Sequence, residues 1–242
     1  MVDIHTHILP GIDDGAVDVD ESLELLRREK ENGVDKVFLT PHFVLGRTTL
    51  EEFLVSREHA YNQLLEAAQG KDIPQLKLGA EVRYTPELME LDLSKLTLGD
   101  SAYLLLELPF DHYPTFIEQF IDNVQNCGIT VILAHVERYA YFRTRPSLLV
   151  DLLNSGVLGQ VTAERFVIKG KKSFAYKFTK KGLAQFIASD THNPSKRPPC
   201  QARLNECLTK EQIEKSEFYA NSVWNDDYIP PVTLKKTGWF FK

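Results

Sequence analysis

The first fifteen residues read MVDIHTHILPGIDDG, and they indicate both a first strand and the chemistry at its end. Val2 to Thr6 forms a short apolar, β-rich run, which predicts a buried strand. His5 and His7 close this run and are two positions apart, so on one strand both rings project to the same side. Two imidazoles on one side of a strand end can bind one metal ion. This stretch therefore predicts a strand with metal ligands at its carboxyl end.

Beyond this stretch, short apolar runs alternate with segments of helical periodicity. The alternation favours parallel strands joined by crossover helices, which form either an open doubly wound sheet or a closed barrel. Pro146 stands where a first helical turn is expected, and Gly33 and Gly128 directly follow helix ends. The predicted strands are residues 2–6, 37–40, 76–82, 103–108, 130–134, 159–163 and 184–189. The predicted helices are residues 22–32, 50–69, 115–127 and 147–155.

Length and composition indicate a globular protein in which one barrel or two small domains would fit. The chain has 242 residues, of which 43% are hydrophobic, and its formal net charge is −6. α/β barrels reach about 250 residues as one domain, and no Gly/Ser-rich or Pro-rich linker divides this chain. We therefore expect one domain over residues 1–242, with an irregular end after Tyr228 that contains Pro230 and Pro231.

Several classes of protein are disfavoured by the same composition. No apolar run reaches the length of a membrane helix, and the N-terminus has neither a basic start nor an apolar stretch, so we expect a cytoplasmic protein without membrane insertion or a signal peptide. The acidic net charge argues against nucleic-acid binding, which usually uses a basic domain. Cys127, Cys200 and Cys207 are too few and too scattered for a disulfide framework or a C-x-x-C metal site.

One local run is strongly basic. Six lysines fall within residues 169–181, interleaved with Phe174, Tyr176 and Phe178, and the spacing predicts one amphipathic helix. Our first interpretation is a solvated helix face, and our second is a docking surface for an acidic partner. The six are Lys169, Lys171, Lys172, Lys177, Lys180 and Lys181.

Metal-binding side chains recur at the ends of the predicted strands. In a barrel the carboxyl ends of the strands converge on one face, so ligands distant in sequence would meet there. A lone His or Glu at a strand end is more often a hydrogen-bonded structural residue, but the joint pattern favours a shared site. His59, within a predicted helix, and His112, in a loop, have no predicted role. The pattern comprises His5, His7, His42, Glu81, Glu107, His135, Asp190 and His192.

Imidazoles and carboxylates without cysteine describe a site for manganese, iron or zinc, not a thiolate structural zinc site. With Asp14 the candidates number nine, more than one ion needs, and two or three ions bridged by carboxylates would use them. Such a cluster can activate water near neutral pH and stabilise both attacking and leaving oxygens, as phosphoester hydrolysis demands. Arg138, three residues after His135, is the first candidate for binding the phosphate, and Arg197 is the second. An ion pair at the barrel rim is the alternative for both, and more so for Arg197.

Other catalytic motifs are absent. The sequence contains no G-x-x-x-x-G-K-[ST] loop, no G-x-G-x-x-G loop and no G-x-S-x-G elbow. A thiol-based phosphatase would place an arginine six residues after its nucleophilic cysteine, whereas those positions here are Leu133, Glu206 and Ile213. Cysteine chemistry is therefore disfavoured.

Six short motifs follow one another along the chain: DIHTH (3–7), PGIDDG (10–15), TPH (40–42), GAE (79–81), HVERY (135–139) and SDTHN (189–193). Together they resemble the polymerase and histidinol phosphatase superfamily, and more narrowly the bacterial manganese-dependent protein-tyrosine phosphatases of capsule and exopolysaccharide clusters. The resemblance spans positions 3 to 199. One segment departs from it, because residues 162–172 begin Thr-Ala-Glu-Arg-Phe where a more polar, Asn-containing segment is expected. This departure concerns loop shape and substrate preference.

The resemblance implies a distorted, TIM-like seven-stranded β/α barrel of one domain with up to three divalent ions, usually manganese. It implies hydrolysis of phosphotyrosine by a metal-activated hydroxide, with Arg138 binding the phosphate. It also implies that the substrate and partner is an autophosphorylated tyrosine kinase that controls polysaccharide polymerisation and export. The metal ligands that it implies are His5, His7, Asp14, His42, Glu81, Glu107, His135, Asp190 and His192.

Two other functions stay open. A small-molecule phosphatase, such as a histidinol phosphate hydrolase, would use the same cluster. A non-catalytic regulatory module would have structural ions and would dock a phosphorylated partner through the basic run at 169–181. The complete ligand set and the presence of Arg138 argue against this module.

Overall fold

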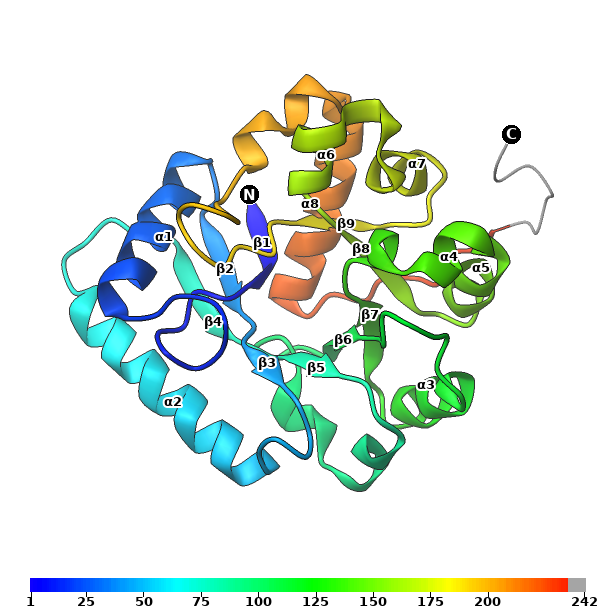
Figure 1. Ribbon diagram of the computed structural model, residues 1–242, viewed down its shortest axis with the longest axis horizontal. Coiled ribbons are helices and arrows are strands. Elements are labelled where there is room, and N and C mark those ends of the chain that lie inside the picture. The colour runs from blue at the N-terminus through cyan, green and yellow to red at the C-terminus, as the bar shows by residue number, and fades with distance from the viewer. Residues whose placement is uncertain (235–242) are drawn as a thin grey trace.

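The computed structural model describes residues 1–234, which form a mixed α/β fold around a curled parallel sheet (Figure 1). The seven predicted strands are present in this range, and two strand positions consist of two short pieces, of which the piece at residues 42–43 lies beyond the predicted range 37–40. The unbroken strands are β1 (Val2–Thr6), β6 (Tyr103–Glu107), β7 (Thr130–Leu133), β8 (Leu158–Thr162) and β9 (Phe186–Ala188). The split strands are β2 (Lys36–Leu39) with β3 (His42–Phe43), and β4 (Gln75–Leu78) with β5 (Glu81–Arg83).

The strand pieces pair in two parallel sheets that continue one another. The first has the order β1-β2-β4, and the second has the order β3-β5-β6-β7-β8-β9. Pro41 has no N–H group and interrupts its strand, but its carbonyl accepts Glu81 N at 3.0 Å. At the far edge, Asp190 N donates to His5 O at 2.9 Å. The segment after β9 therefore returns to β1, and the carboxyl ends of all strands face the same way.

The four predicted helices are present close to their predicted positions and lie outside the ring of strands (Figure 1). The side chain of Asp18 caps the first by accepting from Glu21 N, and Thr49 and Glu52 form a capping box at the second. These starts are therefore encoded locally. The helices are α1 (Val19–Glu31), α2 (Leu50–Ala67), α3 (Ile117–Asn126) and α5 (Pro146–Asn154).

The structure also contains helices that the periodicity does not predict. The longest, α8 (Lys210–Asn225), starts at a capping box of Thr209 and Gln212 but buries small polar residues such as Ser216 and Ser222, so its apolar stripe is weak. The other α-helices are α4 (Ala140–Thr144), α6 (Glu164–Lys169) and α7 (Phe174–Lys180). The 3-10 helices are η1 (Pro86–Glu90), η2 (Leu93–Leu96), η3 (Val136–Arg138), η4 (Gly170–Lys172) and η5 (Gln201–Glu206).

The basic run at 169–181 does not form the single amphipathic helix that we predicted. Helix α6 ends at Lys169, and Gly170 then adopts a φ of 52°, which lies outside the helical range. Helix α7 begins only after Ser173, whose Oγ accepts Tyr176 N at 3.1 Å. The prediction was wrong because a glycine and an N-cap serine end and restart the helix within four residues.

Helix α8 closes the amino-terminal side of the strands. Its Trp224 packs in an apolar cluster with Phe38 of β2 and Leu105 of β6, and the rings of Trp224 and Phe38 are 5.0 Å apart. Directly after the helix, Asp226 Oδ1 accepts Ala102 N at 2.8 Å. Because this side is filled with apolar side chains, the polar residues meet at the opposite, carboxyl side.

Residues 227–234 contain no helix or strand, as predicted for the chain after Tyr228. The rest of that predicted irregular end, residues 235–242, lies outside the described part. Cys127, Cys200 and Cys207 are free thiols. None of the helices within residues 1–234 is long and apolar enough to span a bilayer.

Candidate metal centre

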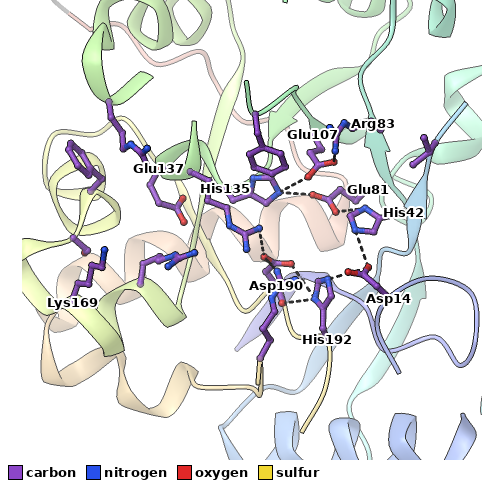
Figure 2. Close-up of a pocket in the computed structure, with 18 of the residues that line it drawn as sticks. Asp14, His42, Glu81, Arg83, Glu107, His135, Glu137, Lys169, Asp190 and His192 are labelled. Atoms are coloured by element: carbon purple, nitrogen blue, oxygen red, sulfur yellow. Dashed lines mark hydrogen bonds and ion pairs between the residues drawn. The ribbon is translucent and has the colours of Figure 1, made fainter. Parts of the chain in front are cut away.

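The nine predicted ligand residues meet at the carboxyl ends of the strands, and all of them except His5 and His7 line one hollow there (Figure 2). Each has a ring nitrogen or carboxylate oxygen within 3.6 Å of such an atom in another member of the set. The set consists of His5, His7, Asp14, His42, Glu81, Glu107, His135, Asp190 and His192. Parallel strands explain why side chains from such distant positions meet.

The middle of this cluster is formed by His5, His7 and Glu81. His5 Nε2 lies 3.1 Å from His7 Nε2, and each nitrogen lies 3.3 Å from Glu81 Oε2. Ligand atoms that bind one ion at about 2.1 Å are separated from each other by roughly 3.0–3.4 Å. The three atoms therefore already have the spacing of ligands around a shared ion.

Two further groups have ligand atoms that lie within 4.8 Å of one another. The first consists of His7, Asp14, His42 and His192, and the second of His42, Glu81 and Glu107. His7, His42 and Glu81 each belong to two of the three groups. The three groups therefore adjoin one another and share possible ligand atoms.

His192 has the protonation state of a metal ligand. Its Nδ1 donates to Asp190 O at 2.9 Å, which leaves the lone pair on Nε2. That Nε2 is buried and has no hydrogen-bond partner among the described residues. Burial and the nearby charge of His7 lower the pKa of His192 to about 3, so the ring stays neutral. A neutral imidazole with a buried free lone pair fits a bound ion.

His7 and His135 are in the opposite state. Burial disfavours a charge on His7, but the Asp13 carboxylate and then Glu81 outweigh it and raise its pKa well above the usual value. For His135, burial is outweighed by hydrogen bonds with Glu107 and Glu81, and the pKa rises to about 9. An ion that binds here must displace these protons, so metal binding strengthens as pH rises.

Two of the nine residues have backbone conformations that non-glycine residues rarely adopt. His135 has a φ of 34° and Asp190 has a φ of 55°, both in the left-handed region. Such conformations persist only where the surrounding structure enforces them, and they cluster at functional sites. Here they turn the chain sharply after β7 and β9, where both side chains line the hollow.

Asp13 is a site residue that the sequence analysis missed. Its Oδ2 lies 2.7 Å from His7 Nδ1 and accepts His42 N at 3.0 Å. Its neighbour Gly15 lets the loop fold back on His7, because a Cβ at this position would lie 1.9 Å from the His7 carbonyl oxygen. A carboxylate on the far nitrogen of a ligand histidine fixes the orientation of its ring. The adjacent pair Asp13-Asp14 was the available signal.

If Asp13 orients His7, then Asp13→Asn is expected to weaken metal affinity by about 10- to 100-fold, as for other residues that orient a metal ligand. Titration of the metal-free protein in a calorimeter measures this affinity. The exposed Asp72 offers a matched control, and Asp72→Asn is expected to leave the affinity unchanged. Equal affinities of Asp13→Asn and the native protein would mean that Asp13 only holds its loop.

Gln160 on β8 is a second residue without a sequence signal. Its Oε1 accepts the backbone N–H of His135 at 2.8 Å and lies 3.2 Å from His5 Nδ1. It therefore positions two of the nine residues at once. The two histidines without a predicted role stay apart from the centre, since His59 is exposed on α2 and the exposed His112 pairs with Asp111 at 2.8 Å.

Arg138 and Arg197 meet at one carboxylate oxygen. Arg138 Nη1 donates to Asp190 Oδ2 at 3.0 Å, and Arg197 Nη2 pairs with the same oxygen. Burial opposes the charge of Asp190, but His5 and the two arginines lower its pKa far below the usual range. Both arginines also line the cavity with side chains 22% and 26% exposed. Both arginines therefore form the ion pair that we gave as the alternative interpretation. Each guanidinium also has further N–H groups that can bind a ligand.

The metal centre forms one part of a cavity of about 820 Å³. Beside it lies Phe110, 40% exposed, whose ring stacks on His135 at a centroid distance of 5.5 Å. The guanidinium of Arg83 lies 5.5 Å from the Phe110 ring and donates to Glu107 Oε2 at 2.7 Å. No sequence pattern distinguishes Phe110 or Arg83. The cavity therefore offers an aromatic wall as well as charged groups.

Residues 1–227 match the family described as capsular polysaccharide synthesis, CpsB/CapC. The tyrosine-protein phosphatase YwqE of Bacillus subtilis (strain 168) is 39% identical over 204 residues, which cover 81% of this chain and 79% of YwqE. The putative tyrosine-protein phosphatase CapC of Staphylococcus aureus is 31% identical, with 99% of each chain covered.

A similar fold is found among solved structures. One of the crystal structures of YwqE from Bacillus subtilis and CpsB from Streptococcus pneumoniae matches with a TM-score of 0.86 and 31% identity, over 96% of this chain and 98% of that chain. These two proteins are described as metal-dependent tyrosine phosphatases.

Proposed function

The chain belongs to the CpsB/CapC family of capsular polysaccharide synthesis, and we propose from this membership that it is a metal-dependent protein-tyrosine phosphatase. The observation that supports this most directly is the cluster of nine imidazole and carboxylate side chains beside two arginines. Metal ligands next to phosphate-binding cations are what hydrolysis of a phosphate monoester requires. The relatives are tyrosine-protein phosphatases by name, which supports phosphotyrosine as the substrate.

For the fold, we propose a distorted seven-stranded β/α barrel that forms a single domain over residues 1–242. The seven strand positions within residues 1–234 and the hydrogen bond from Asp190 N to His5 O support closure of the sheet. In such a barrel the carboxyl ends of the strands converge, which explains why every strand position except β8 contributes at least one of the nine residues, while β8 contributes Gln160.

We assign metal binding to the nine residues of the cluster: the seven that make up the three groups, together with His135 and Asp190, which approach Glu81 at 2.9 Å and His5 at 3.5 Å. Glu81, which belongs to two groups, could be shared between ions. Oxygen and nitrogen donors without sulfur suit manganese, with iron or zinc as alternatives, and two or three ions would use all nine. When bound, such ions lower the pKa of water to near neutrality and offset charge on phosphate oxygens. Asp13 and Gln160 orient His7, His5 and His135 toward this position.

The remaining roles belong to side chains that line the cavity. Arg138 and Arg197 bind the equatorial phosphate oxygens and neutralise the charge that develops in the transition state. Asp190 holds both guanidinium groups at the edge of the metal centre. Phe110 supplies an aromatic face for the phenol ring of the substrate. We assign no covalent phosphoenzyme, since hydrolysis by activated water needs no protein nucleophile.

The proposed partner is a phosphotyrosine protein. The family's association with capsular polysaccharide synthesis favours an autophosphorylated tyrosine kinase that controls polysaccharide export. Such a partner would place this protein in the cytoplasm.

Phosphate release from a phosphotyrosine peptide and from a matched phosphoserine peptide tests the proposal. Both are assayed after chelation and again after addition of manganese, magnesium or zinc, with histidinol phosphate alongside. We expect turnover that manganese restores and that favours phosphotyrosine. Faster hydrolysis of histidinol phosphate would indicate a small-molecule phosphatase. No turnover with any metal, although elemental analysis finds bound ions, would support a regulatory module.

Metal removal is also expected to destabilise the fold. Binding to the native state at 100 times the dissociation constant adds about 2.7 kcal/mol, so chelation is expected to lower the melting temperature by roughly 5–10 °C. Differential scanning calorimetry with and without chelator measures the shift, and added manganese is expected to reverse it. An unchanged melting temperature in protein that has lost its ions would contradict binding at the buried centre.

A further inference from the structure

The cavity continues beyond the metal centre into a second region with four basic side chains, which we call the basic subsite. Arg143 comes from α4, Arg165 and Lys169 from α6, and Lys172 from η4, and all four line the cavity. Figure 2 shows Lys169 on the side of the cavity opposite Asp14, with Asp190 and His135 between them. The subsite is therefore separate from the nine ligand residues but open to the same space.

These four cations are not neutralised by the protein. None of them forms an ion pair with a carboxylate of residues 1–234, whereas Arg138 and Arg197 do. Apart from the nine candidate ligands, the acidic side chain in the described lining is the buried Glu137, whose Oε1 accepts Thr162 N at 3.2 Å. This part of the lining therefore has one carboxyl group and four basic groups. A cavity lined by several cations of one sign has a positive local potential that attracts anions.

The subsite is also partly preorganised. Arg165 and Lys169 are four residues apart on α6 and so lie on the same face of the helix. The guanidinium of Arg143 lies 5.7 Å from the centre of the Phe174 ring and donates weakly to the Glu137 carbonyl oxygen at 3.4 Å. Both arginines are half-buried. An anion would therefore meet partly desolvated donors, which bind more strongly than fully solvated ones.

We propose that the basic subsite binds a second anionic side chain of the same phosphopeptide whose phosphotyrosine occupies the metal centre. The inference rests on the proposed function. A second phosphate fits better than a carboxylate, because it has a charge of about −1.5 to −2 and three acceptor oxygens, and guanidinium groups bind phosphate in a bidentate manner. The preferred substrates are then segments with two phosphorylated residues.

The structure divides the basic run of the sequence accordingly. All five of these lysines are exposed, but only two of them line the cavity: Lys169 and Lys172 do, and Lys171, Lys177 and Lys180 do not. We therefore assign substrate selection to Lys169 and Lys172, together with Arg143 and Arg165, and not to the basic run as a whole. This division provides matched control variants.

The test uses three peptides of equal length, all with one phosphotyrosine at the same position. The first has neutral flanking residues, the second has a flanking glutamate, and the third has a flanking phosphoserine. The readout is kcat/KM for each acidic peptide divided by that for the neutral peptide, in the manganese-loaded full chain. We expect a ratio of roughly ten for phosphoserine and a smaller one for glutamate. Both ratios are expected to fall at high ionic strength.

The variants compare residues inside and outside the subsite. Arg165→Gln and Lys169→Gln are expected to bring the phosphoserine ratio to within about twofold of one, because each removes a charge-assisted hydrogen bond. Lys171→Gln and Lys180→Gln are expected to keep the native ratio. Melting temperatures of all four variants establish that they fold, and the ratio is unaffected by a uniform loss of active protein.

Two results would overturn the inference: a native ratio near one for both acidic peptides, or an equal decrease in the Lys171→Gln and Lys180→Gln controls. A failure of the proposed function looks different, because then no phosphotyrosine peptide is hydrolysed. In that case fluorescence anisotropy with the same labelled peptides still decides the matter. Tighter binding of the phosphoserine peptide that is lost in Arg165→Gln supports the subsite, and equal binding of all three peptides contradicts it.

Discussion

The variant His5→Ala is expected to lower kcat/KM for a phosphotyrosine peptide by about 10³-fold or more, because it removes one of the three atoms at the middle of the cluster. A bound metal supplies several kcal/mol of transition-state stabilisation, and about 4 kcal/mol corresponds to a factor of 10³. Initial rates at saturating manganese, with bound metal counted by elemental analysis, measure the effect. We expect both activity and metal content to fall.

The control for this variant is His59→Ala, which removes an exposed imidazole from α2 and is expected to keep native activity. Although His5 is fully buried, its neighbours are the other polar groups of the centre, so the variant is expected to remain folded. Circular dichroism checks this point. An unfolded variant would mean that His5 is needed for the structure and would leave His42→Ala, at a partly exposed position, as the deciding measurement.

Asp190 requires a different substitution from His5. Alanine at this position would leave Arg138 and Arg197 without their shared carboxylate, and breaking a buried ion pair is strongly destabilising. Asp190→Ala is therefore expected to lose stability as well as activity. Asparagine keeps the shape and tolerates the left-handed backbone of this residue. Asp190→Asn is thus the variant that separates chemistry from folding.

The second large effect is expected for Arg138→Ala. Loss of one charge-stabilising donor costs about 3 kcal/mol, or roughly 150-fold in kcat. Because its role is in the transition state, kcat is expected to fall more than KM rises. Steady-state kinetics on the phosphotyrosine peptide gives both parameters. Arg203→Ala is the control, because it removes an exposed guanidinium that does not line the cavity, and it is expected to have no effect.

Near-normal turnover of Arg138→Ala would assign the phosphate to Arg197 instead. Since both arginines pair with Asp190 Oδ2, their effects are coupled, and the double variant is expected to lose less than the product of the two single losses. Full multiplicativity would show that the two guanidinium groups act independently.

The ligand set could be read from the sequence because its geometry follows from two local regularities. Apolar runs predict strands, and in parallel strands the residue just after each run faces the same side. His7, His135 and Asp190 were found in this way. The helices with clear caps and apolar stripes were found as well, whereas α8, which buries Ser216 and Ser222, was not. Periodicity fails where a helix packs through small polar side chains.

Residues that act through another residue could not be found in this way. The roles of these residues depend on their partners in the fold. Asp13 Oδ2 lies 2.7 Å from His7 Nδ1, Gln160 Oε1 accepts His135 N at 2.8 Å, and Arg83 Nη1 donates to Glu107 Oε2 at 2.7 Å. Two of these contacts join positions more than twenty residues apart. No spacing rule predicts such contacts, since they depend on how separate elements pack.

The charges of the basic run at 169–181 likewise show which properties depend on sequence and which depend on packing. Composition alone determined that positive charge is concentrated there, and Gly170 and Ser173 were local signals for breaking the helix. Only the packing of α4, α6 and η4 decided that Lys169 and Lys172 line the cavity with Arg143 and Arg165 while Lys171 does not.

The sequence by itself determined the alternation of strands and helices and the nine candidate ligand residues. These are local properties, because periodicity, residue type and position at a strand end are all encoded within a few neighbouring residues. Tertiary structure alone decided which rings are charged, which arginines share Asp190 and which lysines line the cavity. Protonation and ion pairing depend on burial and on the nearest charges, and these are set when distant segments pack together.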